Sequence, residues 1–130
     1  MCGWLYFYIH LVTEVACFYF LSKVTNGALI VWLVPFIYDA LAFVPQGIIG
    51  YFSDKFPKVN IGIIGIFLMI LSYVLQFTLG TNLFVNLFIL TIGNCIMHIS
   101  GAEDTLRVSN GLLSHPAIFV AGGSFGVITR

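Results

Sequence analysis

The chain has 130 residues, of which 60% are hydrophobic and only 8% are charged, and its net charge is zero. A soluble domain has about 25% charged residues, so this composition excludes a water-facing globular surface and indicates an all-α integral membrane protein. A neutral chain gives no basis for nucleic-acid binding. The three cysteines form no metal-binding spacing, and we predict no metal site and no cofactor.

Five apolar runs follow one another along the chain, separated by short polar segments. Four of them approach or exceed the roughly 20 residues needed to cross a bilayer: residues 4–22, 28–52, 60–79 and 83–99. A fifth run, residues 116–130, is too short to span, and we expect it to be a truncated helix of a longer protein. The sequence therefore predicts a transmembrane helix bundle with four full spans and a truncated fifth, forming a single incomplete domain over residues 1–130.

Local features refine this bundle. Pro35 and Pro45 lie inside the second run and should bend it. The longest polar stretch, residues 100–111, is compatible with a short amphipathic helix at the membrane interface. Glycines that recur at close spacing predict tight helix packing, in the pairs Gly47 and Gly50, Gly62 and Gly65, and Gly122 and Gly126.

The basic residues favour an N-terminus in the cytoplasm, because cytoplasmic loops are enriched in lysine and arginine. With that orientation the cytoplasmic segments hold Lys55, Lys58 and Arg107, whereas the outer turns hold Lys23. The side of the membrane on which Arg130 lies is left open. We accordingly predict a multi-pass protein of the plasma or inner membrane.

The presence of ionisable residues inside the spans needs an explanation, because inserting each one at the middle of a membrane helix costs about 2.5–3.5 kcal/mol. Glu14 lies near the middle of the first span and Asp39 near the middle of the second. His10 precedes Glu14 by four residues and shares its helix face. In the fourth span, His98 and Asn94 lie one turn apart, with His98 roughly 6 Å nearer the cytoplasm.

Two interpretations of these residues stay open. In the first, they line a proton- or substrate-handling cavity in which Glu14 is the protonatable carboxylate. In the second, they are structural and a Glu–His hydrogen bond ties helices together. Asp39 has a further structural interpretation, in which its carboxyl group forms a hydrogen bond to backbone groups that the kink at Pro35, four residues earlier, leaves unpaired. No enzyme signature is present, so we predict no catalytic residues.

A charged segment after the second run has the pattern Gly50-x-x-x-Asp54-Lys55-x-x-Lys58. It resembles the cytoplasmic loop between the second and third helices of major facilitator superfamily transporters, with Pro57 where that family usually has glycine. A second likeness, to the fosmidomycin-resistance branch, lies in the first span (His10 to Glu14), in residues 38–46 and in the fourth span (Gly93 to His98).

The resemblance implies a secondary transporter whose two halves rock around a central site. It implies that the first and fourth helices line the cavity, which would bring Glu14 and His10 near Asn94 and His98. It also assigns Gly50, Asp54, Lys55 and Lys58 to a cytoplasmic gate motif, and it implies that Asp54 meets a helix N-terminus of the other half of the protein.

We therefore expect the N-terminal fragment of a secondary active transporter that moves a small organic solute by alternating access and is coupled to protons. Its partners would be the solute, protons, the lipid bilayer and the missing C-terminal helices. The alternative is a small multi-pass membrane protein with a structural or partner-binding role.

Overall fold

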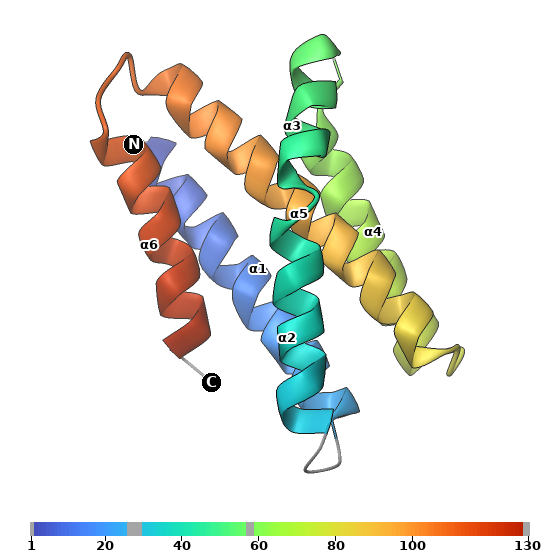
Figure 1. The fold of residues 1–130 in the computed structure, drawn as a ribbon. Helices are drawn as coiled ribbons and strands as arrows, with labels where there is room; N and C mark the ends of the chain where they lie inside the picture. The colour runs from blue at the N-terminus through green and yellow to red at the C-terminus, as the bar shows by residue number, and fades with distance from the viewer. Residues whose placement is uncertain (1, 26–29, 57–58, 129–130) are drawn as a thin grey trace. The chain divides into compact units, whose positions relative to one another are not determined.

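The computed structural model describes residues 2–25, 30–56 and 59–128, which form helices and short connections with no β-strand among them (Figure 1). In chain order the helices are α1 (Cys2–Val24), α2 (Ile30–Phe43), α3 (Gln46–Lys55), α4 (Ile61–Phe77), α5 (Leu83–Val108) and α6 (Ser114–Ile128). The predicted all-α class is confirmed by these elements.

Among the described residues, three stretches of helix are long and apolar enough to cross a membrane: Trp4–Val24, Leu33–Lys55 and Leu83–Val108. They correspond to the first, second and fourth predicted spans. The third predicted span, residues 60–79, forms the shorter α4 of 17 residues. Its ends are set locally, because Asn60 Oδ1 accepts a hydrogen bond from the Ile63 N–H at 3.3 Å and the chain turns at Gly80 with a φ of 59°.

The second predicted span, residues 28–52, is interrupted between Phe43 and Gln46. Helix α2 ends at Phe43 and α3 begins at Gln46, so the bend predicted at Pro45 is a break between two helices. Proline lacks the N–H that would continue the backbone ladder. The Gln46 side-chain amide donates to the Ala42 carbonyl at 3.2 Å, which satisfies an acceptor at the end of α2. At Pro35, in contrast, the helix continues.

The polar stretch of residues 100–111 is not a separate amphipathic helix, because most of it forms the last turns of α5. Within those turns the Thr105 hydroxyl donates to the Gly101 carbonyl at 2.7 Å, and Arg107 pairs with Glu103 one turn earlier. The polar side chains are thus satisfied along the helix itself. The helix ends before two residues of positive φ, Asn110 at 48° and Gly111 at 85°.

The chain divides into two compact units, and each is described by itself. Unit 1 comprises Met1–Tyr19 and Ser100–Arg130, which supply most of α1, the end of α5 and all of α6. Unit 2 comprises Phe20–Ile99, which supplies α2, α3, α4 and the first part of α5. Of the candidate site residues, His10 and Glu14 belong to unit 1, and the others belong to unit 2.

In unit 2, α4 and α5 approach closely where two glycines face each other. A Cβ on Gly65 would lie 2.8 Å from the Gly93 carbonyl oxygen, and a Cβ on Gly93 would lie 2.9 Å from the Gly65 carbonyl oxygen. Such backbone approach is how small residues hold membrane helices together. The packing role predicted for Gly65 is confirmed. At Gly47 and Gly50, an added Cβ would meet nothing within 4 Å in the described part of the chain.

A buried amide, Asn86, fixes the connection between α4 and α5. Its Nδ2 donates to Gln76 Oε1 at 2.8 Å, and its Oδ1 accepts from the Thr81 hydroxyl at 3.0 Å. The Ser72 hydroxyl donates to the Asn86 backbone carbonyl at 2.8 Å. Because buried polar groups are costly when unpaired, this network favours a single register of the two helices. Sequence reasoning did not identify it.

Candidate functional site

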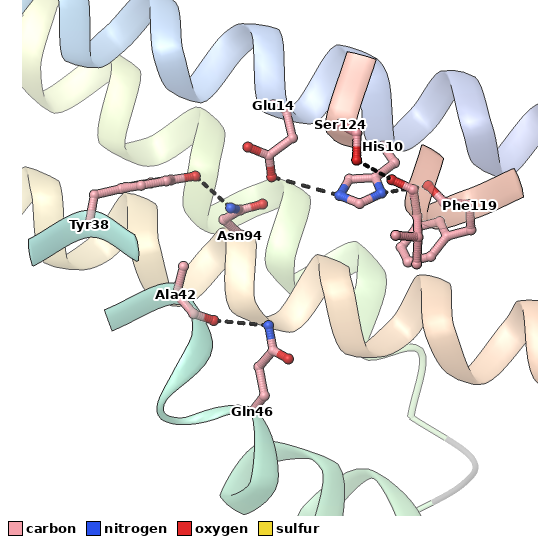
Figure 2. Close-up of polar contacts among 9 residues, drawn as sticks. His10, Glu14, Tyr38, Ala42, Gln46, Asn94, Phe119 and Ser124 are labelled. Carbon is pink, nitrogen blue, oxygen red and sulfur yellow. Dashed lines mark hydrogen bonds and ion pairs between the residues drawn. The ribbon is translucent and has the colours of Figure 1, made fainter. Parts of the chain in front are cut away.

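The central feature of unit 1 is a buried pair of ionisable side chains on α1, His10 and Glu14, each only 6% exposed. His10 Nε2 lies 3.8 Å from Glu14 Oε1 (Figure 2). The pair is one helical turn apart, so the predicted shared face is confirmed. The separation exceeds a hydrogen bond, but it is shorter than the roughly 4.6 Å that two hydrogen bonds through a tetrahedral water would span.

A residue of α6, Phe119, holds the other side of the imidazole ring. His10 Nδ1 lies 2.7 Å from the Phe119 carbonyl oxygen, and the two rings stack with centroids 4.4 Å apart and planes inclined by 23°. The Phe119 ring lies against Gly101 of α5, where an added Cβ would come within 2.5 Å of a ring carbon. Three helices of unit 1 therefore meet at Phe119.

Glycines of α6 allow this helix to lie directly on α1. A Cβ on Gly122 would collide with the backbone of Phe7, one on Gly123 with the His10 ring, and one on Gly126 with the Glu14 Cβ. The packing predicted for Gly122 and Gly126 is confirmed. Gly123 lies between them and was not singled out by the sequence pattern, although it is the glycine that contacts the imidazole.

In unit 2, Asn94 on α5 donates through Nδ2 to the Tyr38 hydroxyl on α2 at 2.5 Å. Both side chains are 2% exposed. His98, one turn further along α5, has its ring against Phe43 at 5.7 Å between centroids, in an edge-to-face arrangement. Asn94 and His98 thus both face α2. Tyr38 is a site residue that sequence reasoning missed, because a tyrosine in an apolar run has no pattern that marks its hydroxyl as buried.

Asp39 follows Tyr38 on α2, and its side chain is exposed on the surface of the described chain. Successive helical residues point about 100° apart, which explains why Tyr38 is buried and Asp39 is not. Its predicted place in a cavity stays a prediction.

The gate motif forms the end of a helix and not a loop. Gly50, Asp54 and Lys55 lie on α3, which ends at Lys55, and both charged side chains are exposed. The Phe56 N–H closes the helix by bonding to the Phe52 and Ser53 carbonyls. Lysine in a last turn complements the helix dipole, whereas an aspartate there does not. Lys58 lies outside the described residues.

The chemistry available to the His10 and Glu14 pair is proton exchange. Together the two groups can hold one proton and stay neutral overall, either as carboxylic acid with imidazole or as carboxylate with imidazolium. An overall neutral pair avoids much of the cost of burying an isolated charge.

These observations define the class of the protein: it is a helical protein in which three helical stretches of the described residues are long and apolar enough to cross a membrane, and the first of them contains a buried histidine–carboxylate pair. No protein-family model, no curated protein and no solved structure matches the chain.

The Tyr38 hydroxyl gives a first test of the fold. We expect Tyr38→Phe to lower the free energy of unfolding by about 0.5–1.5 kcal/mol, because the buried Asn94 amide loses its acceptor. Tyr51→Phe is the matched control, since Tyr51 is 65% exposed. Unfolding in mixed detergent, followed by helical circular dichroism, measures both. Equal stabilities of the two variants would contradict the contact.

Proposed function

We propose that this chain forms the N-terminal helices of a secondary active transporter of the major facilitator type, which moves a small organic solute by alternating access and is coupled to protons. The observation that carries the proposal is the buried His10–Glu14 pair in a helix long enough to span a membrane. The proposal places the protein in the plasma or inner membrane with its N-terminus in the cytoplasm.

A buried carboxyl group within an apolar helix of membrane-spanning length favours a functional role. Ionisable residues within spans are rare because of their cost, and they commonly mark proton and substrate pathways. Glu14 has a partner that can accept or return its proton without leaving a net charge on the pair. Proton coupling requires a group of this kind, which is neutral in one step of the cycle and exchanges its proton in another.

The end of α3 supports the same proposal independently. Asp54 is exposed at a helix C-terminus, where the helix dipole of its own helix disfavours a negative charge. An approaching helix N-terminus would stabilise it, as the family resemblance implies. Gly50, one turn earlier, has no described atom near the position of a Cβ, which leaves space for a helix of the other half to pack there.

A second candidate function is structural, and one observation favours it. The bond between His10 and the Phe119 carbonyl links α1 to α6, so the buried polar groups could serve to hold helices together in a small multi-pass protein that binds a partner. The length of the native gene product separates the candidates. A reading frame that continues beyond Arg130 with further spans favours the transporter, and a stable 130-residue product favours the structural role.

The direct test uses the complete product of the gene that encodes this chain, reconstituted into liposomes that contain a pH-sensitive dye. We expect an imposed gradient of a transported solute to move protons across the membrane, and an imposed pH gradient to drive accumulation of that solute. A panel of small organic solutes that includes anions, cations and neutral compounds would be screened. Solute uptake that never moves protons would contradict the coupling, and the absence of uptake for the whole panel would count against transport.

A further inference from the structure

The hydrogen bond from His10 to Phe119 determines which ring nitrogen can exchange a proton. The Phe119 carbonyl oxygen has lone pairs and no hydrogen, so it can only accept. The contact of 2.7 Å at Nδ1 therefore requires the proton to be on Nδ1. In the neutral imidazole the lone pair is then on Nε2, since the bond made by one ring nitrogen sets the state of the other.

Nε2 is also the atom that faces the carboxyl group, 3.8 Å from Glu14 Oε1. We propose that His10 is the immediate proton acceptor and donor for Glu14, with its tautomer fixed by the Phe119 carbonyl and its ring position fixed by Gly123; this rests on the proposed function. In the step itself the proton leaves the Glu14 carboxyl oxygen and binds His10 Nε2, which yields a carboxylate and an imidazolium. No other bond changes, and the reverse step restores both neutral groups.

The geometry favours this arrangement over the other tautomer. With the proton on Nε2, the neutral ring would present a lone pair to the Phe119 carbonyl, so two acceptors would face each other at 2.7 Å in a buried site. The same ring would have no lone pair left for a proton from Glu14. The carbonyl of α6 thus makes His10 ready to receive a proton on the side of Glu14.

Gly123 holds the ring within reach of that carbonyl. A Cβ at this position would overlap the imidazole at Nε2 and at the neighbouring Cε1, and the ring would have to rotate away from Phe119. The adjacent Ser124 is exposed, and its hydroxyl bonds within α6 to the Val120 carbonyl at 3.4 Å. Gly123→Ala is therefore the informative variant, and Ser124→Ala is its control on the same helix.

The decisive measurement is nitrogen NMR of histidine-labelled complete protein in lipid bilayers, which distinguishes a protonated from an unprotonated ring nitrogen. The chain contains three histidines, and the His10 resonances are assigned by their loss in His10→Gln. In the neutral ring we expect the proton on Nδ1 and the lone pair on Nε2. A neutral His10 with its proton on Nε2 would overturn the inference without any variant.

In Gly123→Ala we expect the ratio of the Nδ1-protonated to the Nε2-protonated ring to fall at least about fivefold, the factor that loss of one hydrogen bond corresponds to. We expect proton-coupled uptake to fall with it, and Ser124→Ala to change neither. An unchanged ratio in Gly123→Ala would overturn the positioning role of the glycine.

The two proposals fail in different ways. If His10 has the wrong tautomer while transport still depends on Glu14, the relay is overturned and the transporter stands. If the tautomer is as expected but proton-driven uptake is unchanged in Glu14→Gln, the relay is overturned and Glu14 is removed from the mechanism, while transport stands. If no solute is taken up, the proposed function fails, whichever tautomer His10 has.

Discussion

Replacing Glu14 with glutamine in the complete protein should abolish proton-driven solute uptake while leaving the helices folded. The amide keeps the size of the carboxyl group and can donate to His10 Nε2, so the buried contact on α1 persists. It cannot bind and release a proton, however, and the pair would lose the exchange on which coupling depends. Uptake driven by a pH gradient, measured in proteoliposomes, is the readout, and helical circular dichroism verifies the fold.

The matched control is Glu103→Gln, which makes the same chemical change outside the apolar part of α5. Glu103 forms a partly exposed ion pair with Arg107, and its loss should cost only about 0.3–0.5 kcal/mol. Uptake by this variant should equal that of the parent protein. Full proton-driven uptake by folded Glu14→Gln would remove Glu14 from the mechanism and leave the structural role of the pair.

A methyl group at Gly93 should cause a large loss of stability in unit 2. The added Cβ would lie 2.9 Å from the Gly65 carbonyl oxygen and 3.0 Å from the Met69 backbone nitrogen. These are backbone atoms of α4 and cannot rotate aside, so α4 and α5 would have to separate. Overpacking of this kind costs about 1–3 kcal/mol, and we expect Gly93→Ala to lower the free energy of unfolding by that amount, as measured by detergent unfolding.

Gly47→Ala is the control for the exchange of glycine for alanine within a helix. Nothing described lies within 4 Å of its added Cβ, and alanine is the better helix former by about 1 kcal/mol. This variant should be as stable as the parent or slightly more so. If Gly93→Ala shared that behaviour, the close approach of the two helices would be refuted.

Much of the fold could be predicted because a bilayer imposes simple rules. A chain with 60% hydrophobic and 8% charged residues can satisfy its backbone in lipid only as helices or closed barrels. The apolar runs are long, so the helices lie close to the positions that the runs predict. The sharing of one face by His10 and Glu14 followed from their spacing of four residues, since that spacing is a property of any α-helix.

Helix ends were predicted less well, because local hydrogen bonds override the change from apolar to polar residues. Residues 100–108 continue α5 although they are polar, since Thr105 bonds back to the Gly101 carbonyl within the helix. The gate motif also continues a helix, because none of its residues up to Lys55 ends α3, and the helix stops only at Phe56. Charge marks what faces water, but it does not end a helix.

The sequence by itself determined the class of the protein, the approximate helices and the pairing of His10 with Glu14. Only the tertiary structure decided that the Phe119 carbonyl holds the His10 ring, that Gly123 makes room for it, and that Tyr38 accepts from Asn94. The reason is physical. Pairing along one helix depends on the fixed helical period, whereas contacts between helices depend on which faces meet. Every residue has a backbone carbonyl, so the sequence cannot indicate which carbonyl accepts a hydrogen bond from His10.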